Sequence, residues 1–210
     1  MGIRAVVFDY GMVLSGPPGK IARAELLRIT GMTEDDFEAL YWKDRHAYDR
    51  GDLNGMQFWR KFVQDAGLAL EDNLLSELNR WDARMWTSEN TAMVRWQKRL
   101  RSEGFTTAIL SNMGDSVLEN IERELEWVQD FDIHVWSYRH GCAKPEPNIY
   151  HLLLQRLATA PEETLFLDDK QINVEAARKF GMQAIPFSNT DQLRQDMISM
   201  KLDEELPLPE

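Results

Sequence analysis

Several polar residues of this sequence stand where buried strands are expected to end. Each follows a run of three or four apolar residues, as Asp9 follows Ala5-Val6-Val7-Phe8. The residues in this position are Asp9, Ser111, Asn112, Asp168 and Asp169. A polar group at the end of such a run costs free energy unless a hydrogen bond, a counter-charge or a ligand uses it. Asp9 alone therefore has two interpretations, as a cap of the next turn or as a nucleophile or metal ligand.

The residue types gathered at these positions suit chemistry on a phosphoryl group. Two or three carboxylates with no His or Cys nearby are typical ligands of a hard cation such as Mg²⁺. Ser111 and Lys144, which lies in the loop GCAKPEP, supply a hydroxyl donor and a positive charge for phosphate oxygens. A carboxylate such as Asp9 can itself be the nucleophile, giving an acyl phosphate that water later cleaves. The metal would then neutralise the charges that keep substrate and Asp9 apart.

The elements that must position these residues predict an α/β fold. Short apolar runs at 5–8, 108–110, 133–136, 165–167 and 183–187 alternate with helical patterns. Strands separated by helices of this length form a doubly wound, Rossmann-like parallel sheet. Such sheets bind ligands at the carboxyl ends of their strands, so the motifs should meet at one edge. After a final helix, we expect the acidic, Pro-containing tail to be loose.

Residues 17–86 carry only helical signals, which predicts an inserted helical cap on a core formed by 1–16 and 87–210. The stretch Ser15-Gly16-Pro17-Pro18-Gly19 reads as a linker or hinge. One helix is expected to begin with Thr33 as N-cap. We interpret the seven tryptophans as packing residues of the core and the domain interface.

Four motifs together resemble those of the haloacid dehalogenase superfamily of hydrolases. They are FDYGMVL (8–14), LSN (110–112), AKPEPNIY (143–150) and LFLDDKQINVEAA (165–177), in the order and spacing of that family. The closest resemblance is to the subgroup of sugar-phosphate phosphatases and the N-terminal phosphatase domains of soluble epoxide hydrolases. The resemblance implies a Mg²⁺-dependent phosphatase that acts on a small phosphorylated metabolite through an aspartyl-phosphate.

The resemblance also implies roles for individual residues. Asp9 matches the nucleophile and Lys144 the lysine that steadies nucleophile and phosphate, while Ser111 and Asn112 match the phosphate-binding motif. The implied metal ligands are Asp9, the carbonyl group of Gly11, Asp169, and Asp168 and Asn173 in support.

The segment 45–59 resembles the part of such caps that reaches the active site. His46, Tyr48 and Arg50 are therefore candidate substrate contacts. The alternative is that Tyr48 belongs to the core of the cap and that the other two lie on a solvated face.

Gly11 departs from the family pattern. Phosphatases of this family usually have a second Asp there, which protonates the leaving group, and a positioned acid/base is worth about 10²–10⁴-fold in rate. Three alternatives stand beside the phosphatase: a metal-independent dehalogenase of a 2-haloacid, a phosphomutase, which also normally needs this acid/base, and a phosphate-ligand-binding protein with weak turnover, which Gly11 favours. The Asp168-Asp169 pair argues against the dehalogenase.

The composition limits the classes of binding partner and the cellular compartment that we expect for this protein. The 210 residues are 43% hydrophobic and carry a net charge of −11, which argues against binding nucleic acid or an anionic membrane. No apolar stretch approaches the roughly 18 residues of a membrane span. The single cysteine, Cys142, excludes an intrachain disulfide, and no signal segment precedes the first strand. We expect a cytoplasmic monomer or homodimer.

Overall fold

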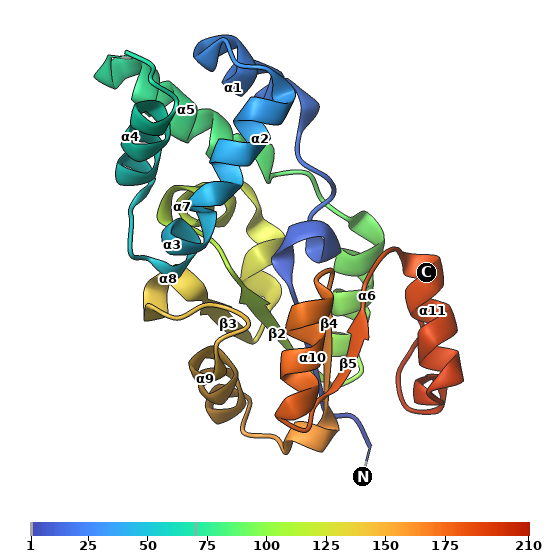
Figure 1. The fold of residues 1–210 in the computed structure, drawn as a ribbon. Helices are drawn as coiled ribbons and strands as arrows, with labels where there is room; N and C mark the ends of the chain where they lie inside the picture. Colours follow the sequence, from blue (N-terminus) through green and yellow to red (C-terminus); the bar gives the residue numbers. More distant parts are fainter. Residues whose placement is uncertain (1, 70) are drawn as a thin grey trace.

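A parallel sheet forms the centre of the molecule. The computed structural model describes residues 2–69 and 71–210, and its five strands lie in the order β3-β2-β1-β4-β5 (Figure 1). They are β1 (Ala5–Phe8), β2 (Thr106–Ser111), β3 (Ile133–Trp136), β4 (Thr164–Asp168) and β5 (Gln183–Pro186). Phe8 pairs with Ile109 on one side and Leu167 on the other. The predicted α/β fold is confirmed, and Asp9 follows the central strand.

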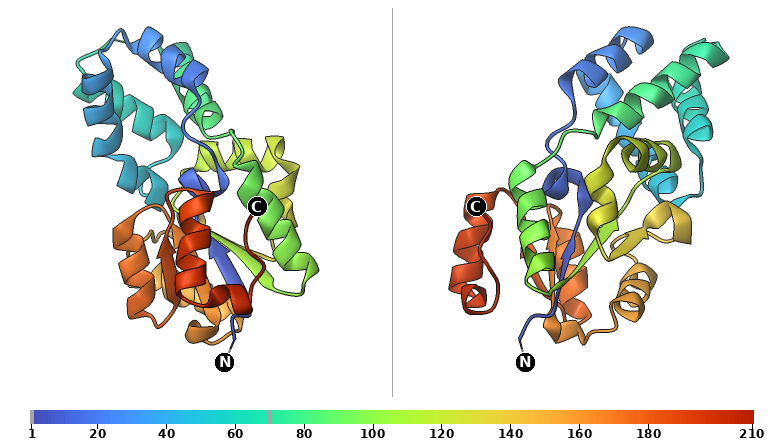
Figure 2. Two further views of the ribbon diagram at one scale, coloured as in Figure 1. Left: turned by 90° about the vertical axis from the view of Figure 1, so that its right-hand side faces the viewer. Right: turned by 180° about the vertical axis from the view of Figure 1, so that it is seen from behind.

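Both faces of the sheet are covered by helices (Figure 2). Val6 and Phe8 pack with α6 (Thr91–Ser102), α7 (Asp115–Glu124) and α11 (Thr190–Ser199). Ala5 and Val7, which alternate with them, pack with α9 (Pro147–Leu157) and α10 (Gln171–Lys179). Because successive strand residues point to opposite faces, a continuous apolar run is the pattern that a doubly covered sheet requires.

Five helices follow β1 and lie beyond the carboxyl ends of the strands (Figure 1). These insert helices are α1 (Lys20–Thr30), α2 (Glu34–Lys43), α3 (Arg45–Arg50), α4 (Gly55–Asp65) and α5 (Asp72–Met85). They enclose a hydrophobic cluster of their own, which includes Phe37, Trp59 and Leu78. Thr33 caps α2 as predicted, because its hydroxyl accepts a hydrogen bond from the amide of Asp36 at 3.2 Å.

The chain enters and leaves the insert helices along two paired segments. The amide of Gly16 donates to the carbonyl of Ser88 at 2.9 Å, and the amide of Gly19 donates to that of Met85 at 2.8 Å. Ser15 and Glu89 form an isolated antiparallel bridge. The predicted hinge is therefore a short two-stranded connection held by backbone hydrogen bonds.

The insert helices also contact α7 and the loop before it. The amide of Gly55 donates to Asp115 Oδ1 at 2.9 Å. The ring of Tyr48 lies so close to Gly114 that a Cβ atom there would stand 2.2 Å from its Cζ. Gly114 thus leaves the space that the ring of Tyr48 fills.

The expectation of a loose C-terminal tail is wrong. Leu206 is 2% exposed and belongs to the same hydrophobic cluster as α6 and α11. The indole of Trp96 donates to the carbonyl of Pro207 at 2.6 Å, and Arg194 donates to that of Pro209 at 2.6 Å. An acidic, Pro-containing composition did not reveal that two leucines of the tail pack against the sheet domain.

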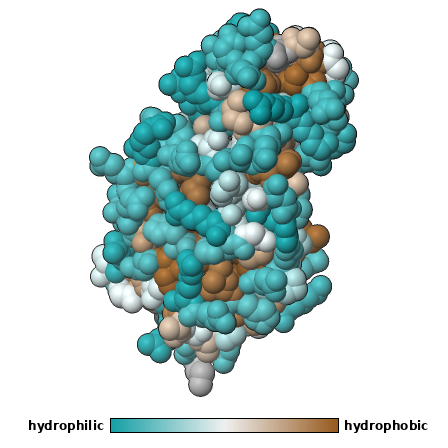
Figure 3. Space-filling model, turned by 90° about the vertical axis from the view of Figure 1, so that its left-hand side faces the viewer, coloured by the Kyte–Doolittle hydropathy of each residue, from teal (hydrophilic) through white to brown (hydrophobic). Residues whose placement is uncertain are grey.

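The surface in Figure 3 is mostly hydrophilic, with apolar residues exposed in small separate areas. None of the helices in the described part of the chain is long and apolar enough to cross a membrane.

Candidate active site

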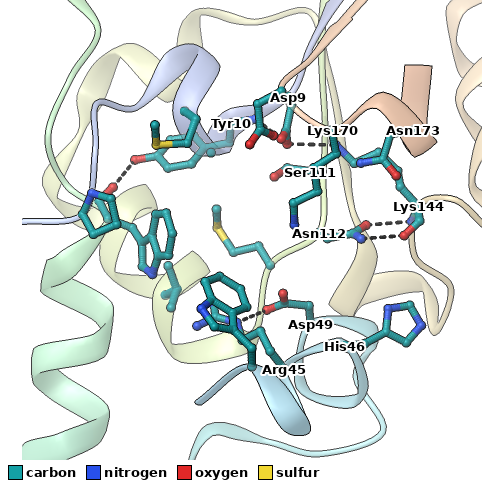
Figure 4. Close-up of a pocket in the computed structure, with 18 residues that line it drawn as sticks. Asp9, Tyr10, Arg45, His46, Asp49, Ser111, Asn112, Lys144, Lys170 and Asn173 are labelled. Atoms are coloured by element: carbon teal, nitrogen blue, oxygen red, sulfur yellow. Dashed lines mark hydrogen bonds and ion pairs between the residues drawn. The ribbon is translucent and has the colours of Figure 1, made fainter. Parts of the chain in front are cut away.

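Asp9 is held in a turn that begins directly after β1. Its Oδ1 accepts a hydrogen bond from the amide of Tyr10 at 2.7 Å, and the amide of Ser15 closes the turn on the carbonyl of Tyr10 at 2.8 Å. The side chain is still reachable, since Asp9 lines a cavity of about 440 Å³ (Figure 4). Asp9 therefore caps the next turn and also faces a cavity, and the two interpretations are compatible.

Lys144 joins the ends of three strands. Its Nζ lies 2.9 Å from Asp9 Oδ1 and 2.6 Å from Asp168 Oδ2, and it donates to the carbonyl of Leu110 at 2.8 Å. The residue is 2% exposed. Burial alone would lower the pKa of Lys144, but the charges of Asp168 and Asp9 raise it above its ordinary value. The ammonium group thus stays charged between two carboxylates that would otherwise repel each other.

Asp168 is fully occupied by protein donors. Besides Lys144, it accepts from Asn173 Nδ2 at 2.9 Å and 3.1 Å and from the amide of Lys170 at 2.8 Å. Its side chain is completely buried. This arrangement suits a residue that orients Lys144 and Asn173 more than one that offers a free oxygen to a ligand.

A divalent cation fits the carboxylates at this edge of the sheet. Asp9, Asp168 and Asp169 each have a carboxylate oxygen within 4.8 Å of the others, although both oxygens of Asp168 already accept from protein donors. The pKa of Asp9 is raised to about 6, mainly by burial and also by the charges of Asp168 and Asp169, while the charge of Lys144 acts in the opposite direction. Burial, followed by the charge of Asp168, raises the pKa of Asp169 as well. An all-oxygen set of crowded carboxylates is what a hard cation such as Mg²⁺ requires.

Ser111 and Asn112 follow β2 but are used differently. Ser111 is 2% exposed and lines the cavity with Asp9 and Lys144. Asn112 also lines the cavity, but its amide group donates to the carbonyl of Lys144 at 2.8 Å and accepts from the amide of Lys144 at 2.7 Å. Asn112 therefore holds the lysine loop against β2.

Of the three candidate contacts from the insert helices, the structure brings one to the cavity. His46 lines it, with Nε2 3.6 Å from Glu146 Oε1. Tyr48 is buried and stacks on Phe58 with ring centroids 4.9 Å apart. Arg50 pairs with Glu146 at 3.0 Å and with Asp52 at 2.6 Å, outside the cavity lining.

Several other residues that line the cavity were not indicated by the sequence motifs. Trp42, Arg45 and Asp49 line the cavity together with His46, and these four positions have the spacing i, i+3, i+4 and i+7 of one helical face. That spacing was the available signal. Met12 and Lys170 also line the cavity, with no comparable signal. The interpretation of all tryptophans as packing residues is wrong for Trp42, which is 47% exposed.

Comparisons with known proteins agree with this geometry. Residues 21–181 match the family model of haloacid dehalogenase-like hydrolases. A phosphatase of Mycobacterium tuberculosis is 28% identical over 94% of this chain and 93% of its own. A (S)-2-haloacid dehalogenase of Pseudomonas is 28% identical over 87% of this chain and 83% of its own. The bifunctional epoxide hydrolase 2 of Sus scrofa is 34% identical over 63% of this chain, but the match spans only 24% of that protein.

A solved structure shows the same fold. A haloacid dehalogenase family enzyme of Bacteroides thetaiotaomicron, in complex with magnesium and inorganic phosphate, superposes with a TM-score of 0.74 over 91% of this chain and 99% of its own. The two sequences are 20% identical, so this likeness concerns the fold. Because the family model covers most of the chain, the protein belongs to the haloacid dehalogenase-like hydrolases.

Proposed function

We propose that this chain is a Mg²⁺-dependent phosphatase that hydrolyses phosphate monoesters of small metabolites through Asp9. The observation that carries the proposal is the position of Lys144, whose Nζ lies 2.9 Å from Asp9 Oδ1 at the wall of a cavity that Ser111 and Asp169 also line. A carboxylate, a fixed ammonium group and a hydroxyl group around one cavity suit a phosphoryl group. The similar phosphatase of Mycobacterium tuberculosis supports the same reaction class.

In the proposed reaction, a carboxylate oxygen of Asp9 attacks phosphorus while the ester oxygen leaves on the opposite side. A new oxygen–phosphorus bond forms on Asp9. The bond from phosphorus to the leaving group breaks, and the ester oxygen keeps the electron pair. Water then attacks the phosphorus of this aspartyl-phosphate and loses a proton to solvent. The bond to Asp9 breaks, its electron pair returns to the carboxylate, and inorganic phosphate is released. Lys144 and the hydroxyl group of Ser111 orient the phosphoryl oxygens and balance their charge in both steps.

The metal is part of the proposal. Asp9 and Asp169 would hold Mg²⁺ together with the carbonyl group of Gly11, and Asp168 and Asn173 would support it. When bound, the cation supplies positive charge that lets an anionic substrate approach an anionic nucleophile. We also propose that residues 17–86 act as a cap over a core of 1–16 and 87–210, and that His46 contacts the substrate.

The experiment is a panel of metabolite phosphates and generic aryl phosphates, assayed for phosphate release with Mg²⁺ and with excess chelator. Wild-type protein should release phosphate only with the metal, and Asp9→Asn should release none. Asp191→Asn, a change in the first turn of α11 at a residue that does not line the cavity, is the matched control and should keep full activity. Unchanged turnover by Asp9→Asn would disprove the proposed nucleophile.

Gly11 favours a second candidate, a protein that binds a phosphate ligand without turnover. The position beside Asp9 Oδ2 carries no side chain, and a Cβ at Gly11 would lie 4.0 Å from that oxygen. Binding of beryllofluoride with Mg²⁺ but no hydrolysis across the panel would identify such a binder. Full activity in chelator, with a 2-haloacid as substrate, would instead favour a dehalogenase.

A further inference from the structure

Met12 has a backbone conformation that is costly for its side chain. Its φ is 62°, in the left-handed region where the Cβ of an L-residue crowds the next carbonyl group. Its side chain is 41% exposed, so burial in the core does not explain the conformation. Met12 instead lines the cavity, three residues after Asp9. Backbone strain at the wall of a site suggests a role for the side chain that it presents there.

Other apolar side chains continue this wall. Among the large hydrophobic residues that the described part of the chain exposes, those at the cavity are Met12 and Trp42. Trp86, Met113 and Val117 line the same cavity. The ammonium group of Lys170 lies 5.7 Å from the centre of the Trp42 ring, which places the indole beside the loop after β4. A wall with two indoles and two methionines suits a flat apolar group.

Two of the polar side chains near this wall, Arg45 and Tyr10, already have protein partners. Arg45 pairs with Asp49 at 2.8 Å and with Asp82 at 3.3 Å, and it is 5% exposed. The hydroxyl group of Tyr10 donates to the carbonyl of Trp86 at 2.7 Å. A leaving group rich in hydroxyls would have to compete with these contacts, because hydroxyl groups need partners when they are buried.

Gly11 adds a chemical constraint on the leaving group. Residue 11 carries no carboxyl group to protonate the departing oxygen, and the carboxylate of Asp49 is held by Arg45. A phenol, with a pKa of about 10 as in tyrosine, leaves more readily as its anion than an aliphatic alcohol, whose pKa is near that of water at about 15.7.

We propose that the substrates are phosphate monoesters of phenols, in which the ester oxygen is bonded directly to an aromatic ring, and that Met12 and Trp42 determine this specificity. The inference rests on the phosphatase activity proposed above. In the first step, Asp9 forms its bond to phosphorus, and the bond from phosphorus to the aryl oxygen breaks. The aryl oxide takes the electron pair and is then protonated by solvent water. The wall at Met12 and Trp42 holds the aromatic ring but takes no part in the bond changes.

The first test compares kcat/KM for 1-naphthyl phosphate, cyclohexyl phosphate and glucose 6-phosphate, with Mg²⁺. The aryl ester should exceed both alkyl esters by at least about 100-fold, since it gains the apolar wall and needs no proton donor. Equal or faster hydrolysis of glucose 6-phosphate would overturn this inference and leave the phosphatase proposal standing. Hydrolysis of no phosphate ester at all would overturn both.

The second test uses Met12→Gly, which fits a positive φ without strain. We expect its kcat/KM for 1-naphthyl phosphate to fall about 10-fold relative to its kcat/KM for acetyl phosphate, which has no ring. Its Tm should be no lower than that of wild type. An equal loss on both substrates would overturn the specificity role.

A matched control and a second variant complete this test. Ala158→Gly relieves the same kind of conformation, with φ 52°, at the exposed end of α9, and it should leave the ratio of the two kcat/KM values unchanged. Met12→Asn keeps a side chain that tolerates positive φ but makes the wall polar. It should lower the ratio as Met12→Gly does, and an unchanged ratio would contradict the proposal.

Discussion

Asn112 and Lys144 exchange two hydrogen bonds across the edge of the sheet. The side-chain amide of Asn112 donates to the carbonyl of Lys144 at 2.8 Å, and its oxygen accepts from the amide of Lys144 at 2.7 Å. Both polar atoms of this side chain are thus committed to the backbone of the lysine loop. We infer that Asn112 positions Lys144 and, through it, the ammonium group beside Asp9.

Replacing this amide should misplace the lysine without removing it. In Asn112→Ala, we expect kcat to fall about 10- to 100-fold, because small displacements of a catalytic group are costly. The free energy of unfolding should drop by about 1–3 kcal/mol, since two backbone groups lose partners. Asn148→Ala, on the exposed side of α9, is the control for both assays and should match wild type. Full activity of Asn112→Ala would mean that the loop holds Lys144 without this pair.

Gly114 should be intolerant of even one added methyl group. Its φ of −73° is allowed for any residue, so only space is at issue, and a Cβ would stand 2.2 Å from Cζ of Tyr48. We expect Gly114→Ala to lower the free energy of unfolding by about 1–3 kcal/mol, as overpacking does, and to lower kcat/KM by shifting α3 at the cavity.

Gly19→Ala is the control for this prediction. Its φ is −62°, and the nearest atom to a new Cβ would be 3.6 Å away. Gly19→Ala should lower the free energy of unfolding, measured with urea, by less than about 1 kcal/mol, which is the loss expected at an N-cap position. If Gly114→Ala is as stable and as active as Gly19→Ala, the contact between Tyr48 and Gly114 does not form in solution.

The sheet and the residues at its edge could be predicted because they follow from topology. Once Asp9, Ser111 and Asp169 are placed at the ends of parallel strands, the order of the strands brings them together. The direction of a side chain within a helix is harder to predict. Tyr48 and Trp42 are both aromatic residues of the insert helices, yet the space at Gly114 takes the ring of Tyr48 while Trp42 lines the cavity. That choice depends on the packing of α3 against the loop before α7, which no local sequence pattern reveals.

A buried carboxylate in the insert helices should make stability depend on pH. Asp82 is completely buried, and its Oδ1 accepts from the hydroxyl group of Tyr41 at 2.7 Å. Burial raises the pKa of Asp82 above its ordinary value of 3.8, although Arg45 opposes this. The folded chain therefore binds this proton more tightly than the unfolded chain does. Its contribution to stability is present at low pH and is lost as the pH rises from 3.8 through the raised value.

Asp82→Asn removes the titration and keeps the shape. The difference in free energy of unfolding, wild type minus variant, should fall as the pH rises from 3.8 in urea titrations. Arg45 stays charged throughout, and the other titrating groups are common to both proteins. A difference that is constant or grows with pH would contradict the raised pKa.

The C-terminal tail should contribute to the stability of the sheet domain. Leu206 is 2% exposed and packs in the cluster that contains Phe8 and Trp96. Replacing a buried leucine by alanine removes apolar contacts and leaves a cavity, so Leu206→Ala should cost about 2–4 kcal/mol in urea unfolding. Ile198→Ala, at a position that is 50% exposed on α11, is the control and should change the value by about 0.5 kcal/mol or less. Equal effects of the two changes would mean that the tail is detached in solution, as its composition alone had indicated.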